Sequence, residues 1–297
     1  MLPRQRKLPA IMSAVSKGGA VLLCVFLIAA IALTMLLPSA SSAASNRQAV
    51  QESLSKTTEA FNAAEPIYQM LREIIEEEIA SLGIEDESEA DLDEAEAGYE
   101  ELSGYTKQLN DLISGLSGLP DDPNTSDGKT VCAAREYLSM LRNMSADLAE
   151  FVRYSIDMYY AIEPFEMMYL DTDDFMILSE ELWNGCEETR TLMGAITPPA
   201  YLAITHNDLM ARITEFRDFA EDFYIACAME DPLRIYSCVY RMNRIVRMFE
   251  ICNDNLYADL ELQLRQAERR LDGPIAQLRS ELTNNLETLK NAQGRGQ

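Results

Sequence analysis

Apolar side chains recur at alternating intervals of four and three residues in two stretches of this chain. The first row consists of Leu202, His206, Leu209, Ile213, Phe216, Ala220, Phe223 and Cys227. The second row consists of Ile235, Cys238, Met242, Ile245, Phe249, Cys252 and Leu256. This spacing places each row on one face of a helix. Because only a short turn separates the two helices, it predicts antiparallel neighbours in a bundle.

The same helical periodicity dominates the chain after residue 45, and strand alternation is nearly absent. We expect helices over about residues 45–82, 88–116 and 129–169, then three more that end near residues 196, 229 and 271. Pro164 predicts a kink in the third helix, and Gly273 and Pro274 predict an interruption or a kink at the end of the sixth. The predicted fold class is all-α: an elongated antiparallel helical bundle preceded by one N-terminal transmembrane or signal helix.

An uncharged apolar run occupies residues 20–37. As a helix it spans about 27 Å, close to the hydrocarbon core of a bilayer. The nearby cations Arg4, Arg6, Lys7 and Lys17 all precede it. The positive-inside rule therefore predicts a single-pass protein in the cell membrane through residues 20–37, with residues 1–17 in the cytoplasm and the chain after residue 37 outside it.

Cleavage of this segment is an open alternative. Ser42, Ala43 and Ala44 provide the small residues of a signal-peptide cut site, which would make the protein secreted. The predicted organisation is a cytoplasmic basic segment at 1–17 and a signal anchor or signal peptide at 18–44. An extracytoplasmic bundle follows at 45–272, with an acidic loop at 83–96 and a second loop at 114–128. Residues 273–297 form a polar C-terminal helix or tail.

Charge is unevenly distributed along the chain. Residues 46–232 carry 11 cations against 41 acids, whereas residues 233–297 carry 10 against 8. A region as acidic as residues 46–232 repels the phosphate backbone of nucleic acids, and we therefore expect no nucleic-acid partner. Residues 128–130 read Gly-Lys-Thr, but Pro123 and the absence of a preceding strand argue against a nucleotide-binding loop. The 14 carboxylates of residues 73–101 indicate a solvated face, with loose cation binding as the alternative.

Five cysteines follow the apolar run: Cys132, Cys186, Cys227, Cys238 and Cys252. Counting residues from the predicted turns places Cys227 level with Cys238, and Cys186 level with Cys252. These are the two disulfide candidates, since disulfides form outside the cytoplasm. The alternative is that all five are small buried apolar residues.

The sequence contains a single histidine, His206, which shares a helix face with Met210. The two are weak metal-ligand candidates, and a core role for His206 is the competing interpretation. One histidine excludes multi-histidine metal sites. We therefore expect no cofactor and no enzymatic activity. The one polar-aromatic group worth inspecting for catalysis combines Tyr154, Tyr159, Tyr160, Glu163 and Glu166.

Residues 196–209 read Ile-Thr-Pro-Pro-Ala-Tyr-Leu-Ala-Ile-Thr-His-Asn-Asp-Leu. This stretch resembles a helix start found in uncharacterised exported bacterial helical-bundle proteins, in which a Pro-Pro precedes a helix carrying His-x-x-Leu. The resemblance implies a helical-bundle fold and no particular activity.

These features predict a membrane-tethered or secreted bundle with a non-catalytic binding, scaffold or envelope-interaction role, acting through a protein partner or self-association. The alternative is a sensor-like or carrier bundle that binds a small ligand or metal cation between helices. A cavity lined by Met, Tyr and His206 favours the alternative, and a close-packed core argues against it.

Overall fold

The computed structural model describes residues 48–80, 92–167 and 174–294. Contacts divide the chain into two units, Met1–Ser55 and Lys56–Gln297. Of the first unit only residues 48–55 are described, and they are helical. The predicted segments 1–17 and 18–44 lie outside the described residues. Among the helices that are described, none is long and apolar enough to cross a membrane. All that follows concerns the second unit.

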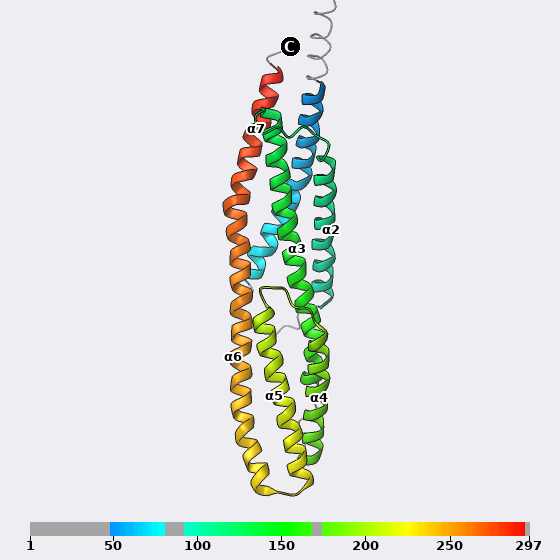
Figure 1. Cartoon of the computed structure of the whole chain (residues 1–297), viewed down its shortest axis with the longest axis vertical. Helices are drawn as coiled ribbons and strands as arrows, with labels where there is room; N and C mark the ends of the chain where they lie inside the picture. Colours follow the sequence, from blue (N-terminus) through cyan, green and yellow to red (C-terminus); the bar gives the residue numbers. More distant parts are fainter. Residues whose placement is uncertain (1–47, 81–91, 168–173, 295–297) are drawn as a thin grey trace, which may run out of the picture. The chain divides into compact units, whose positions relative to one another are not determined.

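Every regular element described in the second unit is a helix, which confirms the all-α prediction for these residues (Figure 1). A helix over residues 56–80 comes first. The others are α2 (Leu92–Gly115), α3 (Ser126–Glu166), α4 (Phe175–Ala195), α5 (Ala203–Ala228), α6 (Pro232–Arg270), η1 (Leu271–Ile275) and α7 (Ala276–Gly294). The predicted helix ends lie within a few residues of these bounds.

Contacts between α2 and α3 show that the two helices are antiparallel. Ser145 of α3 donates a hydrogen bond to the carbonyl of Leu102 at 2.7 Å. Earlier in α3, Arg135 bonds the carbonyl of Leu116, and later in α3 the guanidinium of Arg153 lies 5.8 Å from the ring of Tyr99. Ascending numbers in one helix therefore meet descending numbers in the other.

The helices α4, α5 and α6 also follow one another in antiparallel order. Glu187 of α4 pairs with Arg217 of α5 at 3.1 Å, and Asp222 of α5 pairs with Arg241 of α6 at 2.6 Å. The turn between α5 and α6 has a local cause. Asp231 accepts hydrogen bonds from the backbone of residues 233 and 234, which caps α6, and Pro232 fits its first turn.

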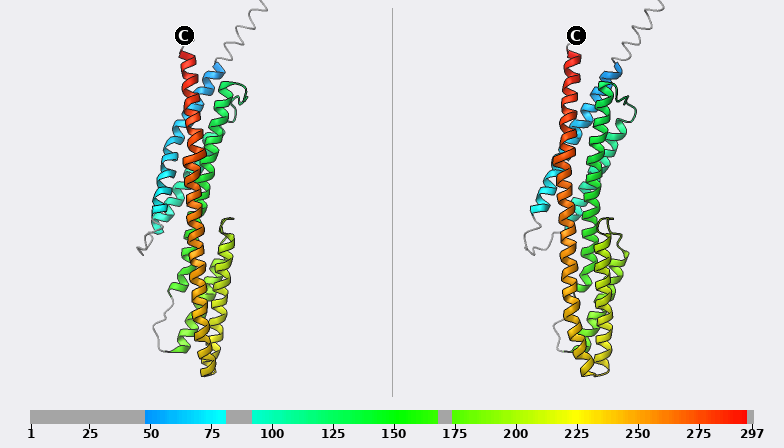
Figure 2. Two further views of the ribbon diagram at one scale, coloured as in Figure 1. Left: turned by 90° about the vertical axis from the view of Figure 1, so that its left-hand side faces the viewer. Right: turned by 60° about the vertical axis from the view of Figure 1, so that its left-hand side comes forward.

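Pro274 does not end the C-terminal helix. The backbone instead widens into one turn of π-helix, η1, in which Leu271 and Ile275 are buried, and it continues as α7 (Figure 2). A wider turn accommodates a proline that lacks an N–H group. Since Arg279 of α7 binds both carboxylate oxygens of Glu65 in the first helix, the bundle extends past residue 272.

Two clusters of buried side chains fill the space between the C-terminal half of α3 and helices α4, α5 and α6. The Phe219 cluster contains Leu182, Cys186, Phe216, Phe219, Ala220, Phe223, Cys227, Cys238 and Ile245. The Tyr154 cluster contains Tyr154, Met158, Ala161, Met193, Leu202, Leu209, Ile213 and Cys252. Both predicted rows of apolar residues point into these clusters.

Candidate functional site

His206 is buried at the edge of the Tyr154 cluster. Its Nδ1 lies 3.2 Å from the hydroxyl group of Tyr154, and the ring makes a backbone hydrogen bond with Met193. Burial lowers the pKa of His206 and raises the pKa of Tyr154 to about 12. The contact therefore joins a neutral imidazole to a neutral phenol. Together with the hydrogen bond to Met193, it connects α3, α4 and α5.

Met210, the second metal-ligand candidate, packs against α4. The methyl group of Met210 packs against Gly194 of α4, 3.6 Å from where a Cβ atom would stand. Within the described ranges, no three His, Cys, Asp or Glu side chains are grouped so that they could hold a metal ion. The geometry of His206 and Met210 is that of core packing.

The five described cysteines carry free thiols, so neither predicted disulfide is formed in this structure. Cys227 and Cys238 lie in the same Phe219 cluster, as level-counting predicts. Cys186 shares that cluster, whereas Cys252, its predicted partner, belongs to the Tyr154 cluster. Counting residues gives a height along a helix, but it does not give the direction in which the side chain points. Burial raises the pKa of Cys186 to about 12, which makes its thiol a poor nucleophile.

The tyrosines of the predicted polar-aromatic group face different ways. Tyr154 points into the core, while Tyr159 and Tyr160 are roughly half exposed and contact each other edge to face. The hydroxyl group of Tyr160 donates to Glu96 of α2 at 3.4 Å. Tyr154, Tyr159, Tyr160 and Glu163 do not line the pocket described below.

The Gly-Lys-Thr segment has a structural task at the start of α3. Thr125 caps the helix by accepting a hydrogen bond from the backbone of Gly128 at 3.2 Å. A Cβ atom at Gly128 would lie 2.1 Å from the carbonyl oxygen of Asp122, so only glycine allows the loop to fold over the helix end. Thr130 donates back to Ser126 at 2.7 Å. Packing explains this glycine and this threonine without a phosphate.

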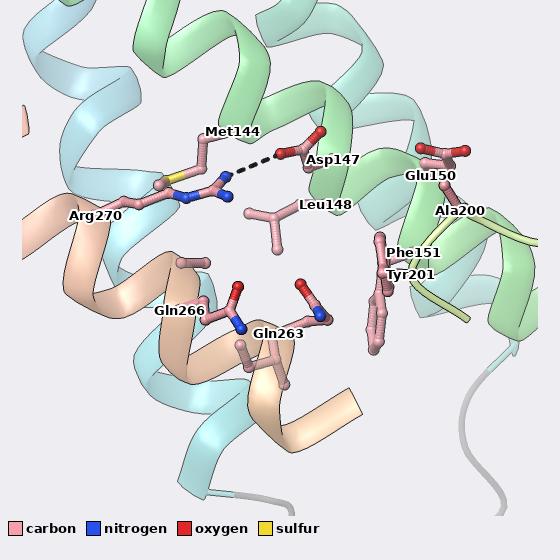
Figure 3. A pocket seen from close by; sticks show the side chains of 12 residues that line it. Met144, Asp147, Leu148, Glu150, Phe151, Ala200, Tyr201, Gln263, Gln266 and Arg270 are labelled. Atoms are coloured by element: carbon pink, nitrogen blue, oxygen red, sulfur yellow. Dashed lines mark hydrogen bonds and ion pairs between the residues drawn. The ribbon is translucent and has the colours of Figure 1, made fainter. Parts of the chain in front are cut away.

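One pocket of about 460 Å³ lies between α3, α6 and the segment that links α4 to α5 (Figure 3). Its apolar lining consists of Met144, Leu148, Phe151, Ala200, Leu264 and Ala267. Its polar lining consists of Asp147, Glu150, Tyr201, Gln263, Gln266 and Arg270. Arg270 is held by Asp147 at 3.3 Å, whereas Glu150 carries no ion pair among the described residues. A small molecule with an apolar body and a polar or cationic group matches this lining.

A second candidate site is a surface rather than a pocket. One face of α6 points away from the bundle and exposes large apolar side chains; we call it the outer face of α6. Its most exposed members are Leu233 (83%), Tyr240 (77%) and Tyr236 (74%), and the half-exposed Ile251 and Leu262 lie on the same face. Figure 2 (left) shows α6 with no described helix in front of it. Exposed apolar rows of this kind are typical of interaction sites.

The charges of α6 divide between the two sides of the helix. Arg241 and Arg234 both pair with Asp222 of α5, at 2.6 and 3.8 Å. Arg244 makes no ion pair with a described residue, and it is exposed on the outer face. The two arginines that flank the α5 contact are therefore used within the chain, and the third is not.

Neither candidate site was predicted from the sequence. The pocket combines residues that are more than 100 positions apart in the chain, and no local sequence pattern indicates it. The outer face did leave a signal, because Leu233, Tyr236 and Tyr240 are spaced three and four residues apart opposite the buried row. A helix with apolar residues on two opposite faces needs a second partner.

Comparison with known proteins adds no relative: no family model, no curated protein and no solved structure matches this chain.

Proposed function

We propose that this chain is an extracytoplasmic helical bundle, tethered to a membrane or secreted, that works by non-catalytic binding and scaffolding. In this proposal the outer face of α6 is its interaction surface. The observation that carries it is the row of large apolar side chains that α6 exposes along a helix whose opposite side is already buried.

Exposure on this scale is costly for a protein without a partner. Leu233, Tyr236 and Tyr240 are each at least 74% exposed and lie within two turns of one helix. Burying one such side chain is worth about 1.5–3 kcal/mol. Tyrosine is also enriched at interfaces, since it combines apolar area with one hydrogen-bonding group. A partner that covers this row gains affinity from the three side chains together.

Export and tethering rest on the N-terminal sequence. The apolar run at 20–37 and the four cations that precede it support a signal anchor, and the small residues at 42–44 support cleavage. Expression of the full chain in a bacterial host, separation of membranes from the soluble fraction and intact-mass measurement distinguish these. A full-length mass in membranes gives the tethered form, and a mass that starts near Ser45 gives the secreted form. A full-length protein in the cytoplasm would contradict both.

Photo-crosslinking tests the surface directly. A photoreactive phenylalanine analogue replaces Tyr236 or Tyr240 in the full chain, expressed in its own host. The matched control places the analogue at Ile204 of α5, which is also highly exposed, at 78%. We expect a discrete adduct from the two α6 positions and none from position 204. Absence of any adduct at positions 236 and 240 would contradict the proposed function.

The pocket favours a second candidate function, a carrier bundle that holds a small apolar ligand. Its volume of about 460 Å³ suits a molecule of drug size, and Met144 and Tyr201 line it as that alternative requires. His206, however, lies outside its lining. Fluorescence of N-phenyl-1-naphthylamine is the probe. Ala267→Trp fills the pocket and should abolish binding, while Thr191→Trp on the exposed side of α4 should not. Equal binding by both variants would rule out the pocket.

A further inference from the structure

We propose that the partner covering the outer face of α6 is a second copy of this chain, and that the two α6 helices pack antiparallel about a twofold axis near Phe249. This inference rests on the proposed function, because it names the occupant of the same surface. The order of charges along α6 favours a second copy, and it defines the register in which the two helices meet.

Charge in α6 is segregated along the helix. Residues 232–249 contain four arginines and no acid, whereas residues 250–262 contain four acids and no lysine or arginine. Several of these charges are used within the chain: Arg234 and Arg241 bind Asp222, Asp259 accepts from Thr205, and Glu261 binds Arg265. Four exposed charges keep no ion pair with a described residue: Arg244, Arg247, Glu250 and Asp254.

Arg244 and Asp254 stand symmetrically about Phe249, and Arg247 and Glu250 lie close to it on either side. In an antiparallel pair centred there, residues at equal distances on either side of residue 249 meet across the axis. Arg244 then faces Asp254 of the second copy, and Arg247 lies beside its Glu250. By symmetry each contact forms twice, which is the property of a self-complementary interface. An antiparallel copy therefore supplies the missing partner of every one of these charges.

The apolar residues of the outer face obey the same register. Tyr236 meets Leu262 of the second copy, so two exposed apolar side chains cover each other. Tyr240 meets Ala258, which pairs a large side chain with a small one. One helix face, on which successive residues are three or four positions apart as helix–helix packing needs, consists of Leu233, Tyr236, Tyr240, Arg244, Arg247, Ile251, Asp254, Ala258 and Leu262. A parallel pair would instead place Arg244 against Arg244 and Asp254 against Asp254.

The distribution of net charge along the chain also favours the approach of a second copy at α6. Residues 46–232 carry 11 cations against 41 acids, so two copies repel each other where these residues approach. Residues 233–297 carry 10 cations against 8 acids and are nearly neutral. The outer face of α6 is thus a surface on which like copies approach with little repulsion.

The size of the contact sets the strength to expect. From Leu233 to Leu262 the outer face extends about 44 Å along one helix. A single helix pair of this length lies near the lower end of the roughly 1,200–2,000 Å² that stable interfaces bury. We expect a dimer of modest affinity that becomes well populated when membrane tethering raises the effective concentration.

A charge exchange tests the register. Two full-length copies with different affinity tags are coexpressed and crosslinked in the intact host cell, and co-capture of one tag with the other is quantified. Arg244→Asp and Asp254→Arg each place two like-charged pairs in the proposed interface. Each variant alone should lower co-capture about three- to tenfold, as expected for two close charge contacts. The double variant Arg244→Asp/Asp254→Arg restores opposite charges and should recover co-capture.

The recovery distinguishes the interface from a structural effect within one chain. Residues 244 and 254 are ten positions apart on one helix, about 15 Å, so they cannot form a pair within the same copy. Ile204→Asp, on the exposed side of α5, is the control and should leave co-capture unchanged. Circular dichroism of each purified variant checks that the helices are intact.

Every outcome is decisive. Loss in both single variants with recovery in the double variant supports the dimer. Loss without recovery, or no loss in either single variant, overturns it. Photo-crosslinked adducts at positions 236 and 240 whose mass exceeds the chain by something other than a second copy would overturn the dimer and leave the proposed interaction surface standing. No adduct at all would overturn both.

Discussion

The hydroxyl group of Tyr154 lies 3.2 Å from Nδ1 of His206, between α3 and α5, in the interior of the bundle. The same imidazole makes a backbone hydrogen bond with Met193 at the end of α4. One side chain thus fixes the relative position of three helices, and its polar atoms are satisfied by the protein. Buried polar groups that are fully satisfied define a unique packing, whereas half-satisfied ones are costly.

Removal of the Tyr154 hydroxyl tests this contact. Tyr154→Phe leaves Nδ1 of a buried imidazole without its partner, so we expect a loss of about 1–3 kcal/mol in the free energy of unfolding. Tyr159→Phe is the control: Tyr159 is 48% exposed, and its hydroxyl group makes no hydrogen bond with a described residue. Urea unfolding followed by circular dichroism gives both values. Equal stability of the two variants would show that the buried hydrogen bond contributes nothing.

Acidification is expected to destabilise the bundle through His206. Burial lowers the pKa of His206 in the folded state, while the unfolded chain keeps an ordinary value near 6.5. Below about pH 6.5 the unfolded state binds a proton that the folded state resists, so stability falls as the pH falls. His206→Gln should flatten the dependence of unfolding free energy on pH between about pH 7.5 and about pH 5.

Ion pairs of carboxylates affect the free energy of unfolding in a lower pH range, so the effect of His206 can be measured separately. A hydrogen bond from Arg190 lowers the pKa of Glu187, and the stability that this supplies is lost only as the pH falls through about 4.5 and below. A His206→Gln variant as sensitive as the wild type between about pH 7.5 and about pH 5 would refute the assignment.

Two glycine substitutions should change stability in opposite directions. Gly128→Ala forces a Cβ atom to within 2.1 Å of the Asp122 carbonyl, so the loop must move away from the start of α3. Gly104→Ala in α2 meets nothing within 4 Å and should stabilise the helix by about 0.5–1 kcal/mol. Thermal unfolding measures both. A Gly128→Ala variant as stable as the wild type would contradict the structural account of the Gly-Lys-Thr segment.

The ion pair between Glu65 and Arg279 should hold α7 on the first helix. Arg279 bonds both oxygens of Glu65, and its guanidinium lies 5.2 Å from the ring centre of Tyr68. Because both side chains are partly exposed, we expect a coupling of only about 0.5–1 kcal/mol from a double-mutant cycle with Glu65→Gln and Arg279→Gln. The exposed pair of Arg72 with Glu76 is the matched comparison and should give less. Coupling as weak at Glu65 as at Glu76 would remove its role in docking α7.

Much of the fold is predictable because helix signals are local. The apolar rows of α5 and α6, the cap at Asp231 and the break near Pro199 depend on residues close in sequence. The outcome at Pro274 was less predictable, since a π-turn depends on burial of Leu271 and Ile275 by other helices. The pairing of Cys186 with Cys252 was hard to predict for a similar reason: counting residues gives the height of a cysteine, but packing places these two in different clusters.

The candidate sites were harder to predict than the fold. The pocket joins Asp147 of α3 to Arg270 of α6, and neither residue is distinctive by itself. The outer face of α6 becomes visible only when the structure shows which of its two apolar faces is already buried. Arg244 illustrates this point, because only its exposed position on the outer face shows that it is available to a partner.

Mixed single-cysteine crosslinking reports whether α6 meets α6 of a second copy in antiparallel register. One full-length copy carries Arg244→Cys, a differently tagged copy carries Asp254→Cys, and both have serine at positions 24 and 132. We expect rapid disulfide crosslinking between the two different copies and little within either population alone, because identical positions lie about 15 Å apart along the axis. Equal crosslinking in all three populations, or none in the mixture, would contradict it.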